Sequence, residues 1–214
     1  MDLSKIEAGT ILGFSDLSAE KQNKYIQKEI ENNNDCFETV AEALIDRLKE
    51  DLYEIGIDVD DIFYSGFWSQ GDGAMFTGSL FIVPDVEKAL LEIPSIDDNF
   101  RNNVVAMQIA LSSMPEGVDV KIEDSSRYCH ENTAMFSWDY DCSEDTYEEW
   151  IRFHGEDELF SLQQTVEECC RSLMIWCYAE IEKEYEDQTS EETAREHLKD
   201  CTWEVVEYKT LEMI

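Results

Sequence analysis

Apolar residues recur at three- and four-residue steps in several parts of the chain, a spacing that predicts amphipathic helices. The first predicted helix opens with a capping signature, Ser15 or Ser18 ahead of Glu20, and continues to about Ile30. The polar run ENNND at 31–35 is expected to end or interrupt it. A second helix is predicted from about Cys36 to Ile55, with Gly56 as its stop. Its apolar stripe comprises Phe37, Val40, Ala41, Leu44, Ile45, Leu48 and Leu52.

From Ile57 to Val83 the apolar period changes to two, which predicts strands. The segment SGFWSQGDGAMFTGS, residues 65–79, is almost uncharged and rich in glycine and aromatic residues. A tight turn centred on Gly71 and Asp72 would make it a β-hairpin. That turn would pair Ser69 with Ala74, Trp68 with Met75, Phe67 with Phe76 and Ser65 with Gly78. Gly66 and Gly78 would then lie inside strands, where glycine marks a bulge or a close backbone approach. We interpret the segment as a core hairpin that packs Trp68 and Phe67.

Later segments continue the mixture of helices and strands. A short helix is predicted at 85–93 and a longer one at 97–114, the latter with Phe100, Val104, Met107, Ile109 and Leu111 mostly inward. VDVKIE and TAMFSWDYD alternate as strands, joined by DSSRYCHEN. A long helix at 158–188 carries an apolar stripe, a capped helix follows, and CTWEVVEYK gives a last strand. The stripe comprises Leu159, Leu162, Val166, Cys169, Cys170, Leu173, Trp176, Cys177 and Ile181.

Strands and helices do not alternate strictly, so the predicted fold class is α+β. We expect an antiparallel sheet of about four strands, built around the hairpin and flanked by several amphipathic helices. The length suits a single domain over 1–214. It would have a helical N-terminal part (15–56), a hairpin and sheet (57–142) and an acidic helical C-terminal part (143–214).

The charge narrows the classes of partner. Sixteen basic and 50 acidic residues give a net charge of −34. Such a surface repels nucleic acid and anionic membranes and favours basic proteins. No stretch is apolar enough to span a bilayer, and the start lacks a secretory pattern, so a cytoplasmic protein is expected. Seven cysteines without framework-like spacing fit reduced thiols.

Sites for chemistry are weakly indicated. Cys129, His130 and Cys142 with His154 match none of the paired zinc-ligand spacings, and Asp72 alone cannot hold a hard cation. We therefore expect no metal, no cofactor and no enzyme activity. On a strand the adjacent Cys129 and His130 would point to opposite faces, although a loop would weaken that objection. The cysteines at 169, 170 and 177 are interpreted as small core residues.

Acidic residues gather near the C-terminal third. Within 139–158 the one Lys or Arg is Arg152. The carboxylates of this run are Asp139, Asp141, Glu144, Asp145, Glu148, Glu149, Glu156, Asp157 and Glu158. A second run contains Glu182, Glu184 and Glu186. Carboxylates along helices can be spaced on the scale of DNA phosphates, so these runs could occupy a DNA-binding groove. The alternative is that they only solvate the protein.

Several stretches resemble a family of tailed-phage and prophage proteins that share the motif SGFxSQGDGAxFxG. They are SGFWSQGDGAMFTGS, DLSAEK, RYCHENTAMF and YAEIEKEYEDQTSEETAREHL, which together span most of the chain. The ending TWEVVEYK departs from the shorter ending of that group. The resemblance implies a small phage product that acts inside a bacterium, and some members are labelled antitoxins.

Three functions remain open on these observations. The first is a non-enzymatic phage inhibitor that binds a basic, DNA-binding groove of a host nuclease, restriction or other defence protein by DNA mimicry. The second is a binding protein or enzyme for a flat, nucleotide-like small molecule, using Trp68, Gln70, Asp72, His130 and Glu131. The third is an antitoxin-like neutralising protein. A homodimer that buries part of the long helix face is also compatible with the sequence.

Overall fold

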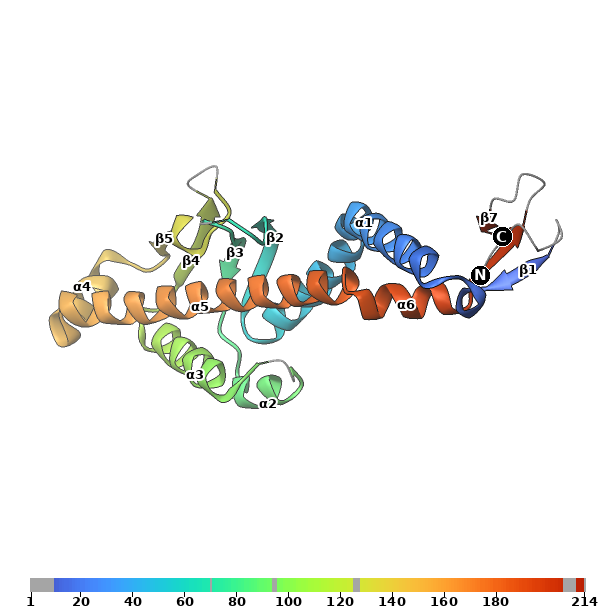
Figure 1. Cartoon of the computed structure of the whole chain (residues 1–214). Helices are drawn as coiled ribbons and strands as arrows, with labels where there is room; N and C mark the ends of the chain where they lie inside the picture. The colour runs from blue at the N-terminus through green and yellow to red at the C-terminus, as the bar shows by residue number, and fades with distance from the viewer. Residues whose placement is uncertain (1–9, 70, 94–95, 125–127, 206–210, 214) are drawn as a thin grey trace. The chain divides into compact units, whose positions relative to one another are not determined.

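The computed structural model describes residues 10–69, 71–93, 96–124, 128–205 and 211–213 (Figure 1). Contacts within the chain gather into two compact units. Unit 1 comprises Met1–Glu42 and Glu182–Ile214, and unit 2 comprises Ala43–Ile181. The two predicted helical parts of the chain therefore both contribute to unit 1. A single domain over 1–214 stays a prediction.

The first helix, α1 (Ala19–Glu54), is continuous, so the predicted interruption at ENNND is wrong. Asparagine disfavours helix interiors because its side chain competes for backbone hydrogen bonds. Here the side chains have partners elsewhere in unit 1. Nδ2 of Asn33 donates to the carbonyl oxygen of Gln188 at 2.8 Å, and Oδ1 of Asn34 accepts from the Tyr185 hydroxyl at 2.7 Å. Tertiary contacts thus override local propensity. The predicted stop is confirmed, since Gly56 follows the helix with φ of +97°.

Unit 1 is built around the indole of Trp203. Its antiparallel sheet has the order β1-β6-β7, formed by β1 (Ile11–Gly13), β6 (Thr202–Val205) and β7 (Leu211–Met213). Helix α6 (Glu191–Lys199) begins after Ser190, whose hydroxyl caps the Thr193 N–H as predicted. The buried cluster consists of Leu12, Leu17, Ile26, Ala194, Leu198 and Trp203. A short 3-10 helix, η2 (Phe14–Asp16), joins β1 to the approach of α1. The predicted last strand is confirmed at β6, and its continuation over 206–210 lies outside the described residues.

Unit 2 contains the predicted four-stranded antiparallel sheet, which confirms the α+β class. Its order is β2-β3-β4-β5, formed by β2 (Ile57–Ser65), β3 (Gly73–Leu80), β4 (Val118–Asp124) and β5 (Ala134–Tyr140). All three pairings are antiparallel. The short 3-10 helix η3 (Glu131–Thr133) leads into β5. The long helix α5 (Glu156–Gln188) packs on β5 through Arg171, whose guanidinium lies over the Phe136 ring.

The hairpin of β2 and β3 is confirmed, but its predicted register is wrong. The observed pairs include Ser65 with Gly73, Tyr64 with Ala74, Phe63 with Met75 and Ile62 with Phe76. Residues 66–69, 71 and 72 therefore belong to a loop instead of a tight turn and its flanking strands. The carboxylate of Asp72 accepts the backbone N–H groups of Trp68 and Ser69, which stabilises this longer loop. Trp68 consequently lies outside the core, with 79% of its surface exposed.

Gly78 confirms the expected close approach of two backbones, whereas Gly66 belongs to the loop. A Cβ atom at Gly78 would collide with the carbonyl oxygen of Asp58 on β2. The collision point lies at a register shift between Val59 and Asp61. Gly78 also has φ of +153°, which other residues rarely adopt.

The remaining helices of unit 2 are α2 (Val86–Leu91), α3 (Asp98–Ser113) and α4 (Glu144–His154). On α3 the predicted inward position of Ile109 is wrong, since that side chain is 61% exposed. Gln108 takes the core position instead and is 4% exposed. Ile109 is two residues from both Met107 and Leu111. Because each residue of a helix is rotated by about 100° from the one before, Ile109 points away from both of them.

The stripe predicted on α5 is confirmed as core. All its members are buried except Leu162, which is half-buried. The seven cysteines are free thiols, and those at 169, 170 and 177 are buried. Sγ of Cys170 lies 3.9 Å from Sδ of Met107, which joins α5 to α3. This stripe is therefore covered within the chain, and the homodimer stays a prediction.

Candidate functional site

The nine carboxylates predicted from the run at 139–158 all belong to unit 2, and all are exposed. They follow the chain from the end of β5, along α4 and into the first turn of α5. Ser143 caps α4 by accepting the Thr146 N–H, and Gly155, with φ of +88°, separates α4 from α5. Acidic residues in the first turns of both helices also complement the helix dipoles. This run forms an acidic surface, which we call the β5–α4–α5 surface.

Glu182, Glu184 and Glu186 are placed differently from the other predicted partner-binding residues. They lie on the part of α5 that belongs to unit 1. Glu186 is exposed, whereas Glu182 and Glu184 are half-buried. Oε1 of Glu184 accepts from Nε2 of Gln188 at 2.9 Å. The predicted acidic set therefore divides between two units, and only the run at 139–158 is wholly exposed.

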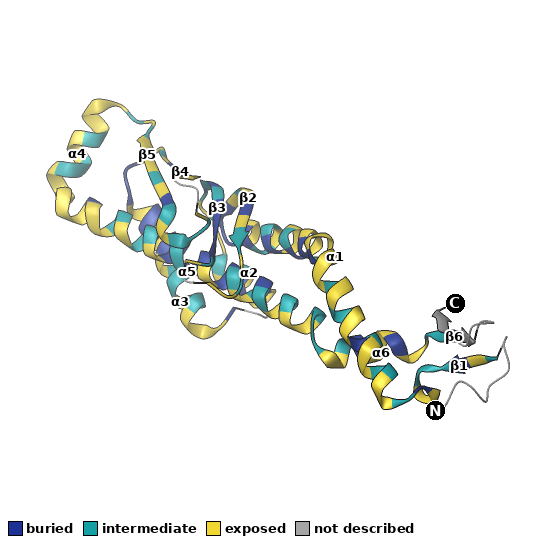
Figure 2. Cartoon of the chain, turned by 45° about the horizontal axis from the view of Figure 1, so that its top comes forward, coloured by how far each residue is buried: buried dark blue, intermediate teal, exposed yellow. Residues whose placement is uncertain are grey.

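Helix α4 has an apolar face in addition to its acidic residues. Tyr147, Trp150, Ile151 and His154 recur at three- and four-residue steps, yet no residue of α4 is buried (Figure 2). Trp150 and Tyr147 connect the helix to other parts of unit 2. Nε1 of Trp150 donates to the carbonyl oxygen of Ser113 on α3 at 3.2 Å, and the centroid of the Tyr147 ring lies 5.2 Å from that of Tyr140. The i, i+3, i+4, i+7 spacing within TYEEWIRFH could have revealed this face from sequence.

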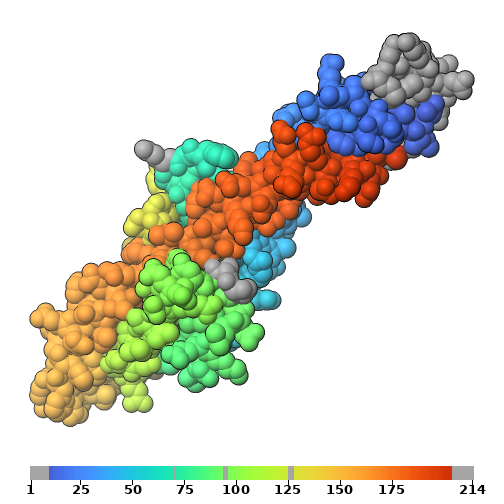
Figure 3. All heavy atoms as spheres, turned by 60° about the horizontal axis from the view of Figure 1, so that its bottom comes forward, coloured from blue at the N-terminus to red at the C-terminus, as the bar shows by residue number. Residues whose placement is uncertain are grey.

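Tyr147 lines two hollows. The larger, of about 620 Å³, is lined by Tyr147, Glu148, Ile151, Arg152 and Glu156. The smaller, of about 330 Å³, is lined by Trp138, Asp139, Tyr140, Cys142, Glu144 and Tyr147. Burial raises the pKa of Tyr140, although the hydrogen bond from Gln163 opposes this effect. The hollows thus combine aromatic and aliphatic walls with four of the exposed carboxylates. Figure 3 shows the light-orange atoms of α4 and the start of α5 beside the green atoms of α3.

The alternative ligand site draws on the hairpin loop and on the segment before β5. Gly73, at the start of β3, lies against both Cys129 and His130, so the two segments do meet. The Asp72 carboxylate, however, is engaged by backbone N–H groups of its own loop. Gln70 lies outside the described residues. The four hollows described in unit 2 are lined by residues other than those proposed for this site.

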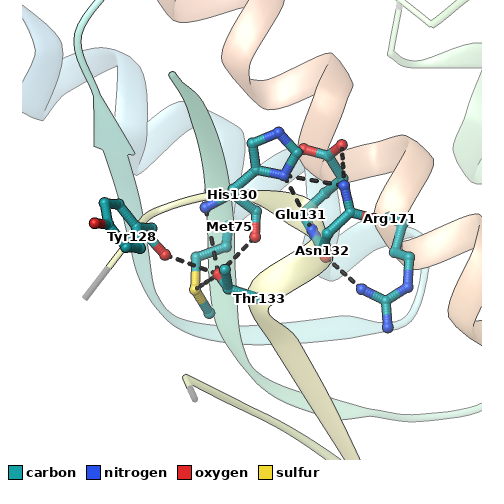
Figure 4. Close-up of polar contacts among 7 residues, drawn as sticks. All are labelled: Met75, Tyr128, His130, Glu131, Asn132, Thr133 and Arg171. Carbon is teal, nitrogen blue, oxygen red and sulfur yellow. Dashed lines mark hydrogen bonds and ion pairs between the residues drawn. The ribbon is translucent and has the colours of Figure 1, made fainter. Parts of the chain in front are cut away.

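His130 and Glu131 are held by local contacts (Figure 4). Nδ1 of His130 accepts the Asn132 N–H at 3.2 Å, and Oε2 of Glu131 lies 2.9 Å from the same nitrogen. Arg171 fixes the segment from α5 by donating to the carbonyl oxygen of Glu131 at 2.5 Å. The polar groups here serve to position the segment.

Cys129 does not resemble an activated nucleophile. Burial raises the pKa of its thiol, and the nearby Asp124 carboxylate raises it further. A catalytic cysteine needs the opposite shift. Among the described residues, no group of three or more His, Cys, Asp or Glu side chains is placed to hold a metal ion.

The described helices include none with the length and apolar character needed to cross a membrane. Residues 40–191 match the model of a family described as Domain of unknown function (DUF8835). No curated protein matches the chain, and no solved structure matches it. The matched span covers unit 2 and leaves the strands of unit 1 outside.

Proposed function

The chain belongs to the DUF8835 family, and we propose that it is an acidic inhibitor that binds the basic, DNA-binding groove of a host defence or DNA-processing protein. The observation that carries this proposal is the β5–α4–α5 surface, on which nine carboxylates from one short run are all exposed. The resemblance of the hairpin motif to phage proteins supports a phage-encoded product that acts in the bacterial cytoplasm.

Spacing and charge both favour this reading of the surface. Carboxylates three or four positions apart on α4 are neighbours on one helix face, about 5–6 Å apart between Cβ atoms. Duplex DNA presents one phosphate per strand about every 3.4 Å of axis. The spacing of these carboxylates is therefore comparable to that of DNA phosphates. Lysine and arginine side chains that line a DNA-binding groove could pair with them. The net charge of −34 would also speed the approach of such a partner.

Neutralising a toxin, the antitoxin-like alternative, would use the same surface on a different basic partner. The small-molecule alternative has one observation in its favour, the meeting of Gly73 with His130. Local bonds already engage the Asp72 carboxylate and the His130 ring, so the acidic surface remains the stronger candidate.

The test begins with capture of partners from a bacterial lysate on the immobilised chain, followed by elution with rising salt. The proposal expects a DNA-binding protein that elutes at high salt and is displaced by duplex DNA. Exposed charge pairs are screened beyond about 8 Å at physiological ionic strength, which makes the salt dependence diagnostic. The captured enzyme should also lose its activity on DNA when the chain is added. A partner that DNA does not displace would contradict mimicry.

Charge reversal locates the interface. Replacing Glu148, Glu149, Asp157 and Glu158 by lysine should weaken binding roughly tenfold or more. The matched control reverses Glu31, Asp35, Glu38 and Glu42, which are equally exposed on α1 in unit 1. Both variants change the net charge by the same amount, so only a local interface separates them. Equal affinity of the two variants would refute the assignment.

The folding of the reversed variant needs its own measurement. Asp157 and Glu158 lie in the first turn of α5, where each carboxylate stabilises the helix by about 0.3–1 kcal/mol. Thermal unfolding should therefore show a modest fall in midpoint with the native spectrum retained. A variant with Asp157→Asn and Glu158→Gln removes the two charges without reversing them, and its binding can be measured in the same way.

A further inference from the structure

The apolar face of α4 goes beyond what phosphate mimicry requires. Tyr147 lines both hollows, and Ile151 lines the larger one. A helix that served only to carry charge would have no use for these side chains. Amphipathic helices normally bury such a face.

From this placement we infer that the hollows beside Tyr147 bind a basic amphipathic helix of the partner protein. The inference rests on the proposed function and names the form of partner surface that the same site recognises. Apolar side chains of that helix would fill the hollows, while its lysine and arginine side chains would reach Asp139, Glu144, Glu148 and Glu156 at the rims.

Charge selects this occupant over a second copy of the chain. The rims of the hollows carry four carboxylates and one cation, Arg152, and the whole chain carries −34. A second copy would bring the same charge against them, and like charges at an interface are unfavourable. A basic helix supplies both the complementary charge and the apolar groups that the walls of the hollows can cover.

Defined peptides can test the inference on the full chain. The first probe is a helical peptide of lysine and leucine, with leucine at three- and four-residue steps. The second has glutamine in place of leucine and the same charge. We expect the lysine–leucine peptide to bind at least about tenfold more tightly than the glutamine peptide. Part of its affinity should remain at high salt, because salt screens only the charge pairs. A leucine analogue that carries a photoreactive group should cross-link within residues 138–156.

Variants of the walls complete the design. Tyr147→Ala and Ile151→Ser should each weaken binding of the lysine–leucine peptide by about tenfold, because each removes an apolar wall of a hollow. Phe153→Ser is the matched control, since this exposed residue lies on the same helix but is not among the residues that line the hollows. It should change the affinity less than about twofold.

The outcomes separate the inference from the proposed function. Equal affinity for both peptides, or no effect of the wall variants, would overturn the inference and leave the acidic surface as the binding element. Failure of both peptides to bind would overturn the inference and also remove support for recognition of basic surfaces. Cross-links that fall outside 138–156 would likewise overturn it.

Discussion

Gln108 offers the sharpest test of how unit 2 is held together. Its side chain is buried in the middle of α3 and makes three hydrogen bonds to the backbone. Nε2 donates to the carbonyl oxygens of Ile55 at 2.9 Å and Phe81 at 3.2 Å, and Oε1 accepts the Val83 N–H at 2.9 Å. One amide group therefore links the end of α1 and the exit of β3 to α3.

Gln108→Met keeps the size of the side chain and removes all three bonds. A buried backbone group left without a partner costs about 1–3 kcal/mol, and a carbonyl with a second lone pair costs less than an N–H. Val83 N–H and the two carbonyls together give an expected loss of about 3 kcal/mol in the free energy of unfolding. That corresponds to a fall in Tm of roughly 6–12 °C for a protein of this size.

Urea unfolding followed by far-ultraviolet circular dichroism measures this loss directly. Gln164→Met is the matched control, because Gln164 is exposed on α5 and the same chemical change should alter stability by less than about 0.5 kcal/mol. The urea m-value should stay constant, since the surface exposed on unfolding is unchanged. A loss below about 1 kcal/mol for Gln108→Met would refute the argument that these backbone groups depend on Gln108.

Four further predictions follow from the fold. Gly78→Ala should destabilise the protein by about 2 kcal/mol or more, measured by thermal unfolding, because its Cβ atom would collide with the β2 backbone; an unchanged Tm would contradict this. Cys36 is exposed and should react at once with a thiol reagent, whereas the buried Cys169 should react only as the protein unfolds. Immediate reaction of both thiols would contradict the burial of Cys169. Burial raises the pKa of Cys169 to about 12 from its ordinary 9.0. The folded state thus keeps a proton that the unfolded chain loses, so this contribution to stability is constant below about pH 9 and declines between about pH 9 and 12. Titration of unfolding with and without Cys169→Ala checks that decline, and identical pH profiles would exclude it. Asp72→Ala should loosen the hairpin loop, seen as faster amide exchange at Ser69, and unchanged exchange would remove its capping role.

Local periodicity predicted the elements of this fold well where one face of an element is buried. The stripe of α5 and the strands β4 and β5 followed directly from apolar spacing. At α1 the prediction failed because the deciding interactions join residues distant in sequence. The continuity of α1 depends on bonds from Asn33 and Asn34 to residues more than 150 positions away, which no local pattern contains.

The hairpin register failed for a different reason. A two-residue turn at Gly71 and Asp72 is a sound expectation when only backbone angles are considered. The Asp72 carboxylate accepts two N–H groups of its own loop and so stabilises a longer connection. These hydrogen bonds to Asp72 stabilise a strand pairing that is shifted along β3. In this pairing Trp68 is exposed, whereas the predicted register places it in the core.

For the candidate site, the sequence predicted the acidic residues but not their setting. Charge is visible in a sequence, whereas exposure depends on the fold. Only the structure shows that the nine carboxylates are all exposed. It also assigns Glu182, Glu184 and Glu186 to unit 1. The apolar face of α4 can be predicted from its three- and four-residue spacing.

Trp203 gives unit 1 an optical signal of its own. It is the single tryptophan within Met1–Glu42 and Glu182–Ile214, and it is fully buried, with the Tyr25 ring 5.0 Å away. In a variant whose other indoles are replaced by phenylalanine, the fluorescence of Trp203 would report the loss of this one core during denaturation. Superposition of that emission curve on the ellipticity of the whole chain would mean one cooperative transition, and an offset would mean two.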